Sequence, residues 1–170
     1  MALQGGRAEE HIVRSIVVGT DGSEPAHEAV RQATDLASRD GARLHLVTAY
    51  HHQQILPETT IWTNDPKGII DTGRTEAPGP HTETVDLREV AESVLKRAAG
   101  DALSKGVEVE THAREGQPAE VIIDIANREQ ADLIVVGSRG LTGIKRYLLG
   151  SVSSKVSEHA PCNVMIVRAG

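Results

Sequence analysis

Two glycine-rich segments of this chain carry residue types that can hold an anion. Gly19-Thr20-Asp21-Gly22-Ser23 follows one apolar run, and a longer segment, 137–151, follows a second apolar run. Glycine permits positive φ and lets the main chain approach a phosphate without a Cβ clash. The free N–H groups at a helix start also favour a negative charge. Both segments are therefore candidate phosphate sites.

The longer segment also has side chains that could bind a phosphate. Its hydroxyls and cations are Ser138, Ser151, Ser153, Arg139, Lys145 and Arg146. Hydroxyl and guanidinium groups donate hydrogen bonds to phosphate oxygens. Because any long surface turn contains the same residue types, composition alone leaves an ordinary loop open as the alternative.

Carboxylate and imidazole groups raise the question of a metal. Asp21 could lie at a nucleotide and help to hold Mg²⁺, or it could bond local backbone N–H groups, as Asp before Gly often does in a turn. Of the eight histidines, His51 and His52 are the densest pair. Adjacent residues of an extended chain point to opposite faces, and we find no Cys or acidic residue at a zinc-like spacing. We therefore expect loop histidines without a metal.

An alternation of apolar runs and helical periodicity must position these segments. The apolar runs predict strands over residues 12–19, 43–50, 107–113, 132–137 and 163–168. Helices are expected between them: the first closed by Gly41, the second ended by Gly106, the third starting at Gly116-Gln117-Pro118 with Pro near its first turn, and the last starting near Gly150. The inward face of the second helix is predicted as Leu87, Val90, Ala91, Val94, Leu95, Ala98 and Ala102. This order is typical of an α/β domain with a parallel sheet.

Composition excludes several function classes. A length of 170 residues favours one domain. The net charge of −6, with no basic run, argues against a nucleic-acid partner, and one Trp with two Tyr gives no platform for stacked bases. No apolar stretch reaches the length of a membrane span, so we expect no membrane partner and a cytoplasmic protein.

The spacing of the longer segment resembles the nucleotide-binding signature of the universal stress protein family. Gly137 is followed by two residues, Gly140, nine residues and then Gly150-Ser151. Residues 17–23, 131–137 and 160–167 add to the resemblance, which covers about residues 12–169. The family leaves the segment 51–84 variable in length.

The resemblance implies a fold and a set of binding residues. The fold would be an open five-stranded parallel sheet of order 3-2-1-4-5 with helices on both faces, Rossmann-like, in one domain over residues 12–169 behind a flexible tail at 1–11. The ligand would be ATP, with Mg²⁺ held near Asp21 through the nucleotide. The implied cofactor-binding residues are Thr20, Asp21, Val47, Gly137, Ser138, Arg139, Gly140, Gly150, Ser151, Val152 and Ser153.

The same resemblance implies a function. We expect a nucleotide-responsive regulatory or protective homodimer of the stress response, paired through Val164, Met165, Ile166 and Val167. The alternatives are a slow ATP hydrolase or phosphotransferase, a binder of another adenine nucleotide such as cyclic AMP, and an interaction dimer without nucleotide. Neither a P-loop nor a G-x-G-x-x-G motif occurs, so the sequence favours binding over turnover, with at most a weak ATPase. The segment 51–84, with Trp62, is expected to be a mobile lid beside the pocket.

Overall fold

The structure is a computed structural model that describes residues 13–51, 86–139 and 149–168. Strands and helices alternate along these ranges. In chain order they are β1 (Ser15–Gly19), α1 (Glu24–Asp40), β2 (Arg43–Tyr50), α2 (Leu87–Ser104), β3 (Val109–Glu115), α3 (Pro118–Arg128), β4 (Leu133–Gly137), α4 (Ser151–His159) and β5 (Asn163–Val167). The predictions for the tail 1–11, for Trp62 with nearly all of the segment 51–84, and for Gly140 lie outside the described residues.

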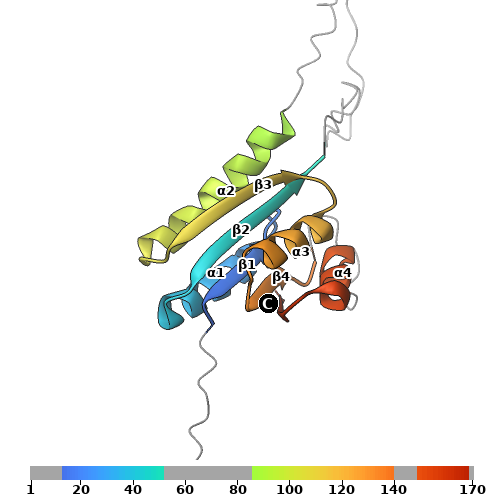
Figure 1. Cartoon of the computed structure of the whole chain (residues 1–170). Coiled ribbons are helices and arrows are strands. Elements are labelled where there is room, and N and C mark those ends of the chain that lie inside the picture. The colour runs from blue at the N-terminus through green and yellow to red at the C-terminus, as the bar shows by residue number, and fades with distance from the viewer. Residues whose placement is uncertain (1–12, 52–85, 140–148, 169–170) are drawn as a thin grey trace, which may run out of the picture.

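The strands form one parallel sheet in the order β3-β2-β1-β4-β5, which confirms the predicted fold. Helices α1 and α2 cover one face of this sheet, and α3 and α4 cover the other (Figure 1). The chain moves outward from β1 through β2 to β3, then returns to add β4 and β5 on the other side of β1. The strand order therefore reverses between β1 and β4, and in open α/β sheets ligands bind beyond the carboxyl ends of the strands at such a point.

Two hydrophobic layers hold the helices to the sheet. Ile16, Leu44 and Leu46 are fully buried toward α1 and α2. On the other face, Val17 and Ile134 are buried against α3 and α4. Both faces of the central strands are thus apolar, as a parallel sheet covered on two sides requires.

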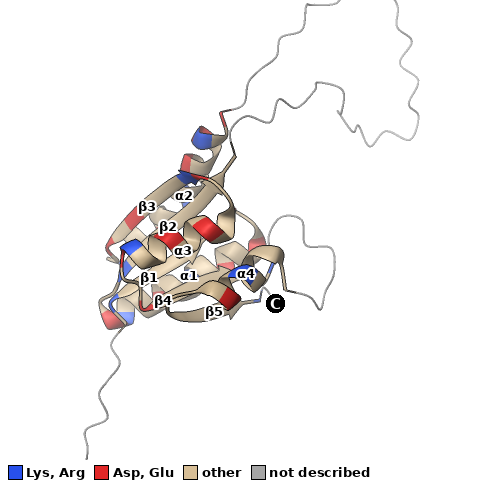
Figure 2. Ribbon diagram, turned by 45° about the vertical axis from the view of Figure 1, so that its right-hand side comes forward, with Lys and Arg blue, Asp and Glu red and all other residues tan. Residues whose placement is uncertain are grey.

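Charged residues are interspersed over the surface. In the view of Figure 2, Lys and Arg alternate with Asp and Glu along the helices and strands rather than gathering on one face. Within the described ranges, no helix combines the length and the apolar character that crossing a membrane requires.

Two strands differ from the predicted bounds by two residues or more. β1 starts at Ser15 rather than at residue 12, because the Asp132 carboxylate accepts hydrogen bonds from the N–H groups of Arg14 (2.8 Å) and Ser15 (3.1 Å) at the point where the chain enters the sheet. β3 runs over Val109–Glu115 rather than 107–113. Its last residues, which are polar because β3 is an edge strand, still pair with β2.

One residue of the second helix was predicted on the wrong face. Val90 is 48% exposed, while the buried residues of α2 are Ala91, Leu95, Ala99 and Ala102. These four lie on one line at helical spacing, and Val90 is one residue, or about 100°, away from it. An apolar side chain in the first turn of a helix was therefore not enough to place it in the core.

Candidate functional site

A cavity of about 390 Å³ lies at the carboxyl ends of β1 and β4, where the strand order reverses. It is lined by Gly19, Thr20, Asp21, Ala26, Val47, Ala49, Pro118, Ile122, Val136, Gly137, Arg139, Gly150, Ser151, Val152 and Ser153. Its size falls within the range of small-molecule sites, roughly 300 to 1,000 Å³. The lining is mainly apolar, with polar groups concentrated in the two glycine-rich turns.

Three helices begin at this cavity. Ala26 lies in the first turn of α1, Pro118 is the first residue of α3, and Ser151 is the first residue of α4. The first turn of a helix has N–H groups without intrahelical partners, and the helix dipole places partial positive charge there. An anion in the cavity would therefore be stabilised by several helix starts at once.

The turn after β1 is fixed by hydrogen bonds to β2 and within itself. The Thr20 N–H donates to the Val47 carbonyl (2.9 Å), and the Thr48 hydroxyl donates to the Thr20 carbonyl (2.8 Å). Asp21 Oδ1 accepts from the Ser23 N–H (3.0 Å), which is the local bond considered from the sequence. Asp21 therefore shapes the turn before α1 and also borders the cavity.

The Ser138 carbonyl joins the end of β4 to the start of α4. The Ser138 carbonyl accepts from the Gly150 N–H (2.8 Å) and from the Ser153 hydroxyl (3.1 Å). Ser153 Oγ also lies 3.0 Å from the Gly150 carbonyl, so this buried hydroxyl positions the start of α4. Within the described ranges, the buried hydroxyls of Ser138 and Ser23 have no hydrogen-bond partner, so each could still form a hydrogen bond.

Gly137 is required by close packing. A Cβ on this residue would lie 2.8 Å from the backbone carbon of Pro25 and 3.0 Å from the Ala26 nitrogen. Only glycine lets the first turn of α1 come this near to the end of β4. The same absence of a side chain leaves the backbone of Gly137 open to the cavity that it lines.

The structure brings most of the predicted binding residues together. The cavity is lined by Thr20, Asp21, Val47, Gly137, Arg139, Gly150, Ser151, Val152 and Ser153. Ser138 lies beside this lining rather than in it, and Gly140 is outside the described residues. The sequence prediction missed Ala26, Pro118, Ile122 and Val136. Pro118 had a usable signal, because a helix that starts directly after a parallel strand begins at the same edge of the sheet as the other turns.

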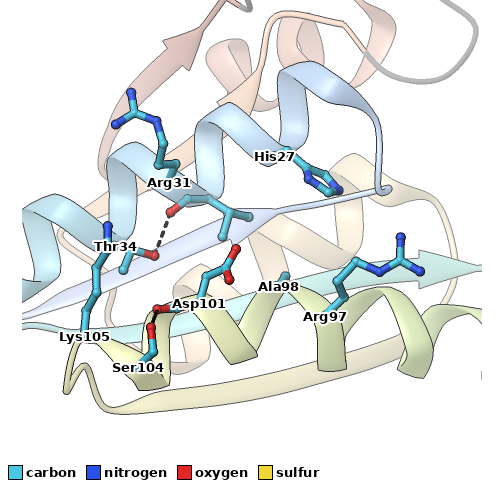
Figure 3. Close-up of a pocket in the computed structure, with 9 residues that line it drawn as sticks. His27, Arg31, Thr34, Arg97, Ala98, Asp101, Ser104 and Lys105 are labelled. Carbon is cyan, nitrogen blue, oxygen red and sulfur yellow. Dashed lines mark hydrogen bonds between the residues drawn. The ribbon is translucent and has the colours of Figure 1, made fainter.

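A second cavity, of about 190 Å³, lies between α1 and α2 (Figure 3). Its polar side chains are largely engaged with nearby groups of the protein. The Thr34 hydroxyl donates to the Val30 carbonyl (2.8 Å), and Lys105 Nζ lies 2.7 Å from the Asp35 carboxylate. This groove shares no lining residue with the cavity at the strand ends, so it is a weaker candidate for a ligand site.

Comparison with known proteins identifies the family. The model of the universal stress protein family matches residues 13–168. This chain belongs to that family. The universal stress protein MJ0531 of Methanocaldococcus jannaschii is 31% identical over 166 residues, covering 95% of this chain and 86% of the relative. The universal stress protein YxiE of Bacillus subtilis is 33% identical over 155 residues, covering 90% of this chain and 97% of the relative.

One solved structure has the same fold as this chain. It is a universal stress protein in complex with cAMP, with a TM-score of 0.64 and 26% identity, covering 92% of this chain and 98% of that one. The resemblance noted from the sequence is thus confirmed at the level of family and fold.

Proposed function

We propose that this universal stress protein binds ATP in the cavity at the carboxyl ends of β1 and β4 and acts as a nucleotide-responsive regulatory or protective homodimer. One observation carries the proposal: three helix starts and two glycine-rich turns converge on a single cavity of suitable size. This arrangement suits a ligand that joins an apolar base to an anionic phosphate chain.

The cavity offers separate surroundings for the two parts of such a ligand. Gly137, Gly150 and Ser151 would face the phosphates, and Arg139 would supply positive charge. Val47 and Ala49, at the end of β2, would border the base, with Ile122 and Val152 adding apolar contact. Gly140, which the sequence spacing also assigns to the phosphates, completes the proposed set.

The residues present also fit Mg²⁺ bound through the nucleotide. Mg²⁺ is usually held by one or two carboxylates together with substrate phosphates and water. Asp21 is the carboxylate that borders the cavity. When bound, the ion would neutralise phosphate charge, and Asp21 would hold it on the side of the β1 turn.

Cyclic AMP is the second candidate ligand, because the solved relative at 26% identity is a complex with cAMP. Both candidates place adenine and phosphate in the same cavity. They differ in the number of phosphates that the glycine-rich turn must accommodate.

The ligand can be identified directly. Mass spectrometry of the nucleotide released from gently purified protein should find ATP, and calorimetric titration should rank ATP above AMP and cAMP. A preference for cAMP would replace ATP with the second candidate. No binding of any adenine nucleotide would contradict the proposal and favour an interaction dimer with an empty pocket. If the pure protein releases phosphate from ATP and a mock purification without the protein does not, the chain is a slow ATP hydrolase.

The proposed dimer uses the exposed edge of β5. β5 is the last strand of the sheet, and Val164, Met165 and Ile166 are partly exposed. An apolar edge strand of this kind invites pairing with a second strand. The double substitution Val164→Lys and Ile166→Lys should give a monomer in light scattering. Because both side chains also pack against the hydrophobic layer under α3 and α4, circular dichroism must accompany the measurement to show that the variant is folded.

The opposite edge of the sheet provides the control. Thr111→Lys adds a charge at an exposed position of β3, the other edge strand, and should leave the dimer intact. A folded β5 variant that stays dimeric would move the interface elsewhere.

A further inference from the structure

A second cluster of chemically active side chains lies near the amino ends of the strands. It consists of His45 on β2, Glu110 and His112 on β3, and Glu129 at the end of α3. One ligand atom from each residue lies within 4.8 Å of all the others. None of these residues lines the cavity at the carboxyl ends of the strands.

The strand register explains why these side chains meet. His45 pairs with Glu110, and His112 pairs with Val47, which lies two residues after His45. All these residues point to the sheet face that α3 covers, because side chains alternate along a strand. Since α3 runs back across the sheet, its last turn brings Glu129 to the amino end of β2.

The two imidazole rings face each other in a nearly dry setting. His45 is 2% exposed and His112 is 7% exposed, and their rings are stacked with centroids 5.4 Å apart. His45 Nδ1 lies 3.2 Å from His112 Nε2, and both nitrogens lie 3.8 Å from oxygens of Glu110. Glu110 is about half exposed, so its carboxylate has room to move toward the rings.

These distances match the requirements of a metal site. Tetrahedral Zn²⁺ with Zn–N bonds of roughly 2.0 to 2.1 Å places two ligand nitrogens about 3.3 Å apart. The two imidazole nitrogens, 3.2 Å apart, are already close to this separation, and one oxygen of each carboxylate lies within 4.8 Å of both nitrogens. A cation here would also lie near the C-terminus of α3, where the helix dipole is negative.

A bound ion would replace one contact between the two rings, because His45 Nδ1 and His112 Nε2 lie 3.2 Å from each other. An imidazole nitrogen is the commonest metal ligand in proteins.

We propose that His45, His112, Glu110 and Glu129 bind one divalent ion of the zinc class in a closed, structural site. Two imidazole and two carboxylate ligands suit Zn²⁺, and four protein ligands leave no open position for catalysis. The ion would fasten the edge strand β3 to β2 and to the end of α3. The proposal is independent of the nucleotide, because the two sites share no residue.

Zinc titration of the untagged full chain, stripped of metal and without nucleotide, tests this site. Calorimetry should show one Zn²⁺ per chain, and Co²⁺ should give the visible absorption of a tetrahedral complex. X-ray absorption at the zinc edge should show scattering from two imidazoles. Removing a group that only hydrogen-bonds to a metal ligand weakens metal binding about 10-fold to 100-fold. His112→Gln and Glu110→Gln each remove a proposed ligand itself, so each should weaken Zn²⁺ binding by at least that much.

A surface histidine provides the matched control. His159 is about half exposed, and its Nδ1 lies 4.0 Å from the Glu158 carboxylate. His159→Gln therefore removes a histidine next to a carboxylate outside the cluster, and it should leave Zn²⁺ affinity unchanged. Glu110→Gln keeps both buried rings and so remains informative even if His112→Gln fails to fold. No stoichiometric Zn²⁺ binding, or binding that Glu110→Gln leaves unchanged, would overturn the proposal.

Discussion

The two ends of the sheet are built from different parts of the chain. At the carboxyl ends of β1 and β4, the cavity is shaped by turns, glycines and helix starts, so its binding groups are largely backbone N–H groups. Near the amino ends of β2 and β3, the cluster is made of imidazole and carboxylate side chains. One end therefore suits an anion, and the other suits a cation.

The comparison also separates two kinds of sensitivity. A site made of backbone depends on how closely elements pack, and it should respond to an added methyl group more than to pH. A site made of buried imidazoles depends on their protonation, and it should respond to pH more than to small changes in packing.

Adding one methyl group at the carboxyl end should destabilise the fold. Gly137→Ala places a Cβ 2.8 Å from the backbone of Pro25, and backbone cannot move aside as a flexible side chain can. We expect the free energy of unfolding to fall by about 1–3 kcal/mol. Urea denaturation measures this loss.

A second glycine gives the control for that substitution. Gly100 lies within α2, and a Cβ there would meet no atom within 4 Å. Gly100→Ala should stabilise the protein by about 0.5–1 kcal/mol, because alanine loses less backbone entropy in a helix. Equal effects of the two substitutions would contradict the packing argument at Gly137.

Lowering the pH should destabilise the protein through the amino end of the sheet. Burial lowers the pKa values of His45 and His112 below the ordinary 6.5, so the unfolded chain binds more protons in this window. The free energy of unfolding, measured with a chelator present, should therefore fall as pH drops below 6.5. Glu110 and Glu129 soften this loss, while Arg43 and Arg114 add to it.

Single substitutions show whether the cluster causes the pH effect. His112→Gln should flatten the curve, and His159→Gln should leave it as in the original chain. The pKa of Glu28 is lowered to about 2 by its hydrogen bond to Arg31. Glu28 therefore takes up its proton at a lower pH than the histidines, and its effect on stability is separate from theirs. An unchanged slope in His112→Gln would assign the effect to other groups.

Substitution of Asp21 should destabilise the fold less than substitution of Gly137 does. Asp21→Ala removes the acceptor for the Ser23 N–H and should cost about 0.5–1.5 kcal/mol. Asp21→Asn keeps an oxygen acceptor and should cost less, while removing the charge that Mg²⁺ would use. If Asn also leaves the Mg²⁺ dependence of ATP binding unchanged, Asp21 has a role in the turn alone.

Sequence reasoning reached the carboxyl end more easily than the amino end, for a physical reason. Glycines 137 and 150 and the turn at Asp21 are local features, so their spacing along the chain indicates where they lie. His45, Glu110 and His112 meet because of the register between β2 and β3, and Glu129 meets them because of the length of α3. The sequence analysis considered the adjacent pair His51-His52, while Glu110-Thr111-His112 is the pattern that places two titratable side chains on one face of a strand.

The errors of the sequence prediction came from local rules that the packing overrode. Val90 fitted a helical stripe but lies off the line of small residues that contacts the sheet. Pro118 and Ile122 were missed because the prediction took the cavity as the work of two turns, while the structure adds the start of α3. The fold itself followed from the alternation of strands and helices, which does not depend on these details.

The central claim is that the start of α4 binds the phosphates of an adenine nucleotide. Ser151 is exposed, lines the cavity and is the first residue of α4. Because the helix dipole stabilises a negative charge at this end, a carboxylate at position 151 should leave the fold intact. Ser154, also exposed, lies one turn later and outside the cavity lining. These two serines form a matched pair.

Calorimetric titration of ATP into Ser151→Glu and Ser154→Glu is the most direct test. The carboxylate at position 151 would face the phosphates, and repulsion of about 1–4 kcal/mol at 4 Å corresponds to at least about fivefold weaker binding. Ser154→Glu should bind ATP within about twofold of the original chain, less than the tenfold that 1.4 kcal/mol represents. Equal ATP affinity in the two folded variants would contradict the account.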